Sequence, residues 1–173
     1  MKSKYITVYF DMDGVLAKWD PNAKTEDTYK KDYFLYCEEE KVVTEVINIL
    51  KEKYTVKILS HAYGKNAIDA KNKWLDKIGL TDIDRIFVPY GNKKSNYINK
   101  DETNVIIDDY TKNLNDWQKD GNIAIKFRNR INGTKGTWTG PSVKYDMSVK
   151  EIVDKIENII NWLELKKQIK DRV

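Results

Sequence analysis

Two aspartates, Asp11 and Asp13, follow directly after an apolar run from Tyr5 to Phe10. The run is rich in β-branched and aromatic residues, which predicts a buried central strand. Residues two apart in an extended chain point to the same side, so both carboxylates would face one space. Like charges this close raise each other's pKa unless a cation lies between them. The pair is therefore either a cation site or a strand end with two solvated acids, and Gly14 allows a turn after it.

Further polar residues follow other segments that are predicted to be strands. Runs of apolar, β-branched and aromatic residues predict strands at residues 54–59, 85–89, 104–107 and 123–127. The residues at or after the ends of the first three could bind an anion or a metal, and they are Ser60, His61, Lys94, Asp108 and Asp109. Arg128 and Asn129 end the last of these strands. Residues 128–147 are predicted to form an extended loop, in which Trp138 could cover the site.

Helices are predicted between these strands. Apolar residues recur at helical spacing in residues 39–53, 66–78 and 114–119, and from residue 148 onward, where Ser148 and Glu151 form a capping box. Strands alternating with helices predict an α/β fold with a doubly wound, Rossmann-like parallel sheet. The carboxyl ends of parallel strands form the ligand crevice of such a sheet. Acid pairs that meet there require a metal, and a lysine and a hydroxyl beside a metal suit a phosphate.

Length and composition limit the class of protein. A chain of 173 residues with 40% hydrophobic residues fits a single domain, spanning residues 1–173, with a substantial core. The net charge is only +4, and four of the 31 basic residues are arginine. This composition is compatible with an anionic small molecule. It does not favour stable binding to duplex nucleic acid, for which a clustered basic face is expected.

Cysteine usage and hydropathy bear on the compartment. The lone cysteine, Cys37, cannot form an intramolecular disulfide and has no companions for a metal site. A reducing cytoplasm is therefore the expected location. The early apolar run is too short for a signal peptide, and no segment has the length of a membrane span. We expect a soluble cytoplasmic protein that does not bind membranes.

These residues closely resemble the haloacid dehalogenase (HAD) superfamily of phosphotransferases. Its four motifs occur in family order, and they are matched by the segment 11–15, Ser60, Lys94 and the pair Asp108-Asp109. The likeness extends from residue 5 to about residue 127. Within the superfamily, the segment 11–17 followed by Trp19 is most similar to the 5′(3′)-deoxyribonucleotidases, and so are the segments 94–95 and 106–109. The resemblance implies a small cap insertion at about residues 18–38, which is much smaller than in the vertebrate members.

The resemblance also implies a reaction. Asp11 would be the nucleophile that forms an aspartyl-phosphate, and Asp13 would be the general acid and then the general base. Mg²⁺ would bind a carboxylate oxygen of Asp11, the backbone carbonyl of Asp13 and a carboxylate oxygen of Asp109. Asp108 would act through a bound water or orient Lys94. The substrate would be a small phosphomonoester, and the resemblance indicates a deoxynucleotide.

Phosphate and base contacts follow from the same resemblance. The Ser60 hydroxyl and the His61 backbone amide would hold phosphate oxygens, and Lys94 would neutralise phosphate, with the adjacent Lys93 as an alternative. Trp19 would stack on the nucleobase, and Tyr33 and Phe34 are weaker candidates because packing of the insertion onto the core explains them equally well. Base-binding residues of the larger family caps are not carried over beyond Trp19.

Three alternatives remain open from the sequence. The first is a phosphatase of the same superfamily that acts on another phosphomonoester, such as a nucleic-acid 3′-phosphate. The second is a receiver-like domain, although its phospho-accepting aspartate is missing after Phe87-Val88-Pro89-Tyr90. The third is a module that binds phosphate without catalysis. A dinucleotide-binding domain is excluded because no G-x-G-x-x-G follows the first strand.

Overall fold

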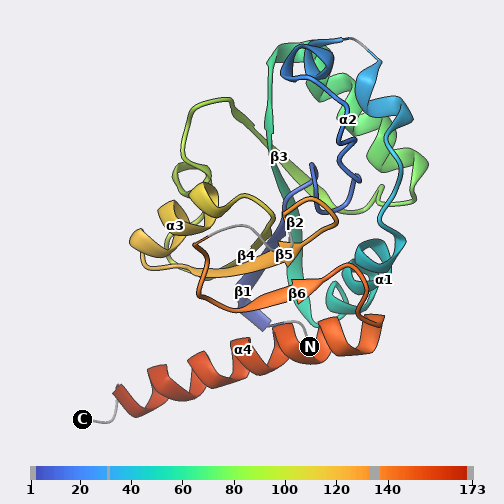
Figure 1. Cartoon of the computed structure of the whole chain (residues 1–173). Coiled ribbons are helices and arrows are strands. Elements are labelled where there is room, and N and C mark those ends of the chain that lie inside the picture. The colour runs from blue at the N-terminus through green and yellow to red at the C-terminus, as the bar shows by residue number, and fades with distance from the viewer. Residues whose placement is uncertain (1–2, 31, 133–136, 171–173) are drawn as a thin grey trace.

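The computed structural model describes residues 3–30, 32–132 and 137–170, and in this part of the chain six strands form one parallel sheet (Figure 1). The strands are β1 (Ser3–Phe10), β2 (Tyr54–Ala62), β3 (Asp84–Pro89), β4 (Thr103–Asp108), β5 (Ile123–Arg128) and β6 (Ser142–Lys144). Their order in the sheet is β3-β2-β1-β4-β5-β6. The predicted α/β, Rossmann-like parallel sheet is confirmed.

Strand β1 lies in the middle of the sheet. Phe10 is paired with Ile58 of β2 on one side and with Ile107 of β4 on the other. The chain first adds strands on the β2 side and then crosses to β4, so the strand order reverses beside β1. Ligand crevices in open parallel sheets form where the order reverses, outside the carboxyl ends of the strands. The residues that follow β1 and β4 therefore meet at this position.

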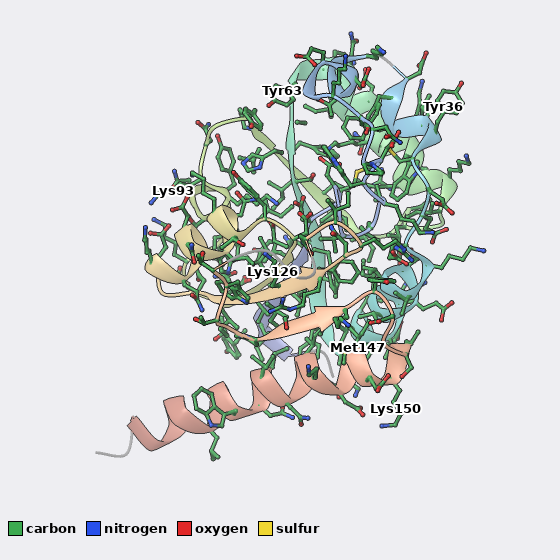
Figure 2. The ribbon with its side chains drawn as sticks, viewed as in Figure 1. Tyr36, Tyr63, Lys93, Lys126, Met147 and Lys150 are labelled. Carbon is green, nitrogen blue, oxygen red and sulfur yellow. The ribbon has the colours of Figure 1, made fainter. Side chains whose placement is uncertain are left out.

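Four α-helices cover the sheet. They are α1 (Lys41–Leu50), α2 (Gly64–Lys77), α3 (Thr111–Lys119) and α4 (Val149–Lys170). Helices α1 and α4 pack together, whereas α3 packs against β4 and β5. The capping box is confirmed, since the Ser148 amide donates to Glu151 Oε2 (2.8 Å) and the Glu151 amide donates to Ser148 Oγ (3.3 Å). Figure 2 shows Lys150, in the first turn of α4, pointing away from the body of the protein.

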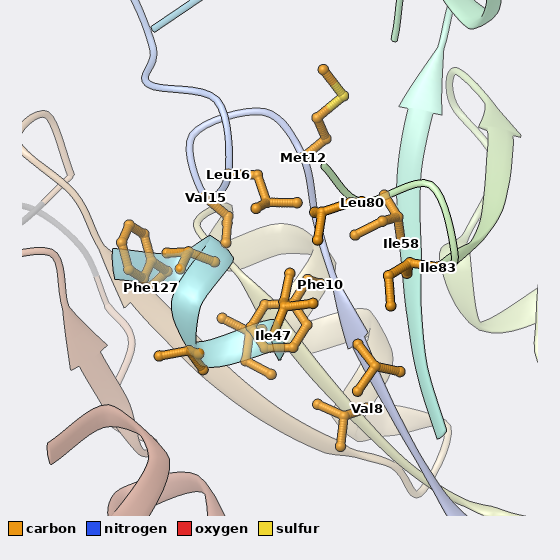
Figure 3. Close-up of a cluster of buried hydrophobic side chains, with 14 of the residues drawn as sticks. Val8, Phe10, Met12, Val15, Leu16, Ile47, Ile58, Leu80, Ile83 and Phe127 are labelled. Carbon is orange, nitrogen blue, oxygen red and sulfur yellow. The ribbon is translucent and has the colours of Figure 1, made fainter. Parts of the chain in front are cut away.

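Buried apolar side chains lie on both faces of the sheet. Val8 and Phe10 belong to the larger cluster, with residues of α1, α2 and α4, whereas Tyr9 packs on the opposite face with α3. The turn after β1 is part of the larger cluster, and Figure 3 shows Val15 and Leu16 among its side chains. Because both side chains are fully buried, the turn that carries Asp11 and Asp13 is anchored in the core.

The segment between β1 and α1, residues 18–38, contains two short 3₁₀ helices. These are η1 (Thr25–Tyr29) and η2 (Tyr33–Tyr36). Both pack against α2, and Trp74 of α2 donates from Nε1 to the Cys37 carbonyl (2.9 Å). Figure 1 shows this insertion beside α2 at the top of the view, with α4 at the bottom.

Two predictions about strands were wrong. Strand β2 continues through Ser60 and His61 to Ala62, because β3 lies alongside and pairs with these residues. The loop predicted at 128–147 contains β6, which pairs in parallel with β5. A strand of three residues is too short to show an alternating pattern, so only the pairing reveals it. Among the described residues, no helix is long and apolar enough to cross a membrane.

Candidate active site

The predicted site residues converge at the carboxyl edge of the sheet, around a cavity of about 670 Å³. Eight of them line it, and they are Asp11, Asp13, Trp19, Phe34, His61, Lys93, Lys94 and Asp109. Ser60 and Asp108 are fully buried immediately behind this surface. Tyr33 is not among the lining residues, and its ring packs edge-on against Phe34 with the centroids 5.1 Å apart.

The turn after β1 is held by its own backbone. The amides of Leu16 and Ala17 donate to the Met12 carbonyl, and the Gly14 amide donates to the Ala17 carbonyl. Gly14 has a φ of +74°, which residues with a Cβ rarely adopt. A Cβ at this position would also lie 2.2 Å from Asp109 Oδ2. Glycine therefore lets the turn bring the β1 acids against Asp109.

Lys94 joins the acids of β1 and β4. It lies in η3 (Lys94–Tyr97), and its Nζ is 2.9 Å from Asp11 Oδ2 and 2.7 Å from Asp108 Oδ2. Burial disfavours its charge, but the two carboxylates raise the pKa of Lys94 above its ordinary value. Lys93 instead reaches the surface, 3.9 Å from Asp120, as Figure 2 illustrates. Of the two lysines, only Lys94 is in contact with the predicted nucleophile.

Asp108 is held from several sides. Besides Lys94, the Tyr110 amide donates to Asp108 Oδ1 (2.8 Å) and Asn113 Nδ2 donates to Asp108 Oδ2 (3.0 Å). Burial nevertheless raises the pKa of Asp108. With both oxygens engaged by N–H donors, Asp108 is suited to orienting Lys94, which is one of the two roles expected for it.

Asp11, Asp108 and Asp109 form an acidic cluster, with one carboxylate oxygen of each within 4.8 Å of the others. Asn129, at the end of β5, donates from Nδ2 to Asp109 Oδ2 and to the Gly14 carbonyl, both at 2.9 Å. Burial, followed by the charges of Asp108 and Asp11, raises the pKa of Asp109 well above its usual range. Burial also opposes ionisation of Asp11, but Lys94 and Lys71 outweigh it and lower the pKa of Asp11.

Asp13 has a lysine partner that the sequence analysis missed. Lys71 of α2 is fully buried, and its Nζ lies 2.6 Å from Asp13 Oδ2. Despite this contact, burial raises the pKa of Asp13. The sequence did carry a signal, since Lys71 occupies the apolar stripe formed by Ala67, Ala70 and Trp74. A lysine in the buried stripe of a helix needs an acidic or polar partner inside the protein.

Charge and donor type decide what this cluster can hold. Asp11, Asp13 and Asp108 form ion pairs with the buried Lys71 and Lys94, and Asp109 lies beside them in the acidic cluster. The buried Lys126 acts on Asp109 from further away, so at close range four carboxylates meet two cations. Full ionisation would leave two negative charges in excess. A divalent cation would compensate them, and carboxylate oxygens are the donors that hard cations such as Mg²⁺ prefer. The residues present therefore fit a divalent metal.

The His61 imidazole lies with aromatic side chains of the rim. Its Nε2 is 2.9 Å from the Asn92 carbonyl oxygen, and its ring meets Tyr90 edge-on. Tyr90 is in turn stacked on Tyr63, with centroids 4.2 Å apart. The imidazole is engaged by this rim, and the role of the His61 backbone amide stays a prediction.

Trp19 and Trp138 have different surroundings. Trp19 lines the cavity from the insertion and keeps 38% of its surface exposed. Phe34 lines the cavity beside it. Trp138 is buried on the α3 face of the sheet and donates from Nε1 to the Pro141 carbonyl (2.9 Å), so the suggestion that it covers the site was wrong. Gly133 and Gly136 of the same loop lie outside the described residues.

The raised carboxyl pKa values predict how stability depends on pH and metal. A raised pKa in the folded state means that folding favours protonation, so the metal-free protein should lose stability as pH rises above the ordinary carboxyl pKa of about 4. Mg²⁺ at about a hundred times its Kd should add about 2.7 kcal/mol at about pH 7.5 and less at about pH 5, where protons compete.

Thermal unfolding with and without Mg²⁺ at both pH values checks this. Asp109→Asn should lose the response to Mg²⁺, while the matched surface variant Asp154→Asn on α4 should keep it. If Mg²⁺ stabilises wild type and Asp109→Asn equally, Asp109 is not a ligand of the metal.

Comparison of the sequence with protein-family models gives no match, and comparison with curated proteins gives none either. The residues of the site and their contacts are therefore the grounds on which a function is proposed. They comprise three carboxylates that could hold a metal ion, with the buried Lys94 in contact with two of them.

Proposed function

We propose that this chain is a Mg²⁺-dependent phosphatase of the HAD type that hydrolyses (deoxy)nucleoside monophosphates through an aspartyl-phosphate. The observation that carries the proposal is the setting of Asp11. Its carboxylate lies on the cavity, 2.9 Å from the Lys94 ammonium and within the acidic cluster. A carboxylate whose pKa is lowered stays ionised and can act as a nucleophile.

The electrostatics favour a phosphate at this position. A carboxylate approaching a phosphate dianion is repelled unless positive charge lies between them. Lys94 supplies one such charge, and Mg²⁺ bound by Asp11, Asp109 and the Asp13 carbonyl would supply the rest. When bound, the metal neutralises phosphate oxygens and lowers the charge barrier to attack. The Ser60 hydroxyl and the His61 amide would hold the remaining phosphate oxygens.

The chain's own groups can carry both halves of the reaction. An Asp11 oxygen attacks phosphorus, and the bond from phosphorus to the sugar oxygen breaks as that oxygen takes a proton from Asp13. Asp13 then accepts a proton from water, whose oxygen attacks phosphorus and releases the Asp11 carboxylate. The raised pKa of Asp13 supports this role, since it keeps a proton available closer to neutral pH.

The size and lining of the cavity support a nucleotide substrate. About 670 Å³ is far more than a phosphate group needs and lies within the usual range for small-molecule sites. Trp19 presents aromatic surface from the insertion. Stacking on an indole is tolerant of base identity, so several deoxynucleoside monophosphates should be accepted.

A nucleic-acid 3′-phosphate is the second candidate substrate. The rim carries exposed aromatic side chains, Tyr90 at 64% and Tyr110 at 59%, together with Lys93 and Lys112. Aromatic and basic side chains at a rim suit the nucleotides that precede a terminal phosphate in a single strand.

Phosphate release from a substrate panel tests the proposal. The panel contains deoxynucleoside and nucleoside monophosphates, a 3′-phosphorylated oligonucleotide, a sugar phosphate and an aryl phosphate. We expect nucleoside monophosphates to exceed the sugar phosphate in kcat/KM by about tenfold or more, and release to stop with chelator. Preference for the oligonucleotide would select the second candidate. No release from any substrate would reject the enzyme and leave a receiver-like or phosphate-binding module.

Variants of the two β1 aspartates should separate nucleophile from acid and base. Asp11→Asn should lower kcat at least about 10⁴-fold on every substrate, because an amide does not attack phosphorus. Asp13→Asn should lower kcat about 10²-fold or more on nucleotides, but less than about tenfold on an activated aryl phosphate, whose leaving group needs no proton. Equal losses from Asp13→Asn on both substrates would show that Asp13 is not the acid.

Trp19→Ala should weaken nucleotide turnover specifically. Loss of stacking should lower kcat/KM for deoxynucleoside monophosphates about tenfold to a hundredfold and leave a sugar phosphate nearly unchanged. Tyr36→Ala is the matched control, since Tyr36 lies in the same insertion, is exposed and does not line the cavity. If Trp19→Ala lowers kcat/KM equally for the nucleotides and for the sugar phosphate, Trp19 contributes to the packing of the insertion instead.

A further inference from the structure

Lys71 lies at the centre of contacts that the proposed mechanism does not use. Its side chain projects from α2 and is fully buried, and its ammonium forms an ion pair with Asp13. Three acceptors surround its Nζ, namely Asp13 Oδ2 at 2.6 Å, the His61 carbonyl at 2.8 Å and Ser60 Oγ at 3.0 Å. An ammonium has three N–H donors, so this geometry occupies all of them. Lys71 can therefore act only through the groups it holds.

The contact with Ser60 fixes the direction of the hydroxyl. A hydroxyl has one O–H donor and two lone pairs, and in this geometry Ser60 Oγ accepts from Lys71. The His61 carbonyl lies 3.5 Å from Ser60 Oγ, which is long for an O–H donor, and it already accepts from Lys71. The Ser60 O–H thus has no short acceptor in this structure, and an anion that reaches this fully buried hydroxyl would supply one. Lys71 makes Ser60 a donor, as a phosphate oxygen requires.

The contact with Asp13 fixes the orientation of the Asp13 carboxylate. Asp13 Oδ2 is bound to Lys71, whereas Asp13 Oδ1 is buried and has no hydrogen-bond partner among the described residues. An unpaired buried carboxylate oxygen is costly, so it marks a place where a hydroxyl or a water is expected. Lys71 holds the carboxylate by one oxygen and leaves the other for the group that exchanges a proton.

An aromatic side chain of the insertion covers the Lys71 ammonium. Phe34 of η2 lies over the ammonium, with Lys71 Nζ 4.4 Å from the ring centroid. A cation over an aromatic face is stabilised and shielded from water. Shielding strengthens the contacts of Lys71 with Asp13 and Ser60, because they operate in a less polar medium.

We propose that Lys71 is a positioning residue that sets Ser60 as a phosphate donor and holds Asp13 for proton transfer. This inference rests on the proposed phosphatase function. Lys94 neutralises the nucleophile side of the site, and Lys71 organises the leaving-group side. Phe34 thereby links the insertion to catalysis by covering this lysine rather than by contacting a base.

Lys71→Met tests the proposal, because methionine keeps a long unbranched side chain but has no charge and no N–H donors. We expect kcat on a deoxynucleoside monophosphate to fall about 10²-fold, and kcat on an aryl phosphate to fall less than about tenfold, since only the first needs Asp13 as acid. Affinity for inorganic phosphate, measured by calorimetry with Mg²⁺, should weaken about tenfold because Ser60 loses its orientation. Lys73→Met, an exposed lysine on the same helix, should change neither value.

A double variant guards against misfolding, since Lys71→Met leaves Asp13 buried without its cation. Lys71→Met combined with Asp13→Asn removes both charges, and its nucleotide kcat should match that of Asp13→Asn alone if Lys71 acts through Asp13. If the double variant has a lower kcat than Asp13→Asn alone, by the same factor on both substrates, and its phosphate affinity is unchanged, Lys71 has a purely structural role.

Failure of the proposed function gives a different result. If the wild-type protein hydrolyses nothing but binds phosphate, the phosphatase proposal fails. The weaker phosphate binding of Lys71→Met would then still support the orientation of Ser60 by Lys71. Equal phosphate binding by wild type and Lys71→Met, or no phosphate binding by either, would overturn the inference.

Discussion

The excess of negative charge at the carboxyl edge of the sheet is the constraint on which the rest of this structure depends. Four aspartates follow β1 and β4, and burial makes their ionised forms unfavourable unless cations compensate. Two fully or nearly buried lysines, Lys71 of α2 and Lys94 of η3, supply part of the compensation. The remaining negative charge would suit a divalent cation, which the proposed reaction requires beside its phosphate.

The fold concentrates these charges because β1 is central and its neighbour β4 ends beside it. The buried side chains of Val15 and Leu16 hold the turn in the core, and Gly14 admits Asp109 against its backbone. Asn129 then joins Asp109 to the Gly14 carbonyl. The acids are thus fixed by packing and backbone contacts, which is how a site can keep like charges together without a ligand.

Patterns within single segments predicted the sheet, and with it the position of Asp11 and Asp109, because strand ends in a parallel sheet share one edge. Lys71 was missed because its helical periodicity resembled a core stripe and its partners lie on other elements. The extension of β2 through Ser60 was missed because it depends on pairing with β3. The packing of Trp138 under α3, likewise, follows from tertiary contacts that no local pattern contains.

The central claim is that Asp11 becomes covalently phosphorylated. Mixing the wild-type protein with a radioactive phosphomonoester and Mg²⁺, quenching in acid and mapping peptides after borohydride reduction tests it most directly. The account predicts label that hydroxylamine removes, and reduction of the labelled carboxyl to homoserine at position 11 alone. Turnover with no protein-bound phosphate, or with the label on any other residue, would contradict it.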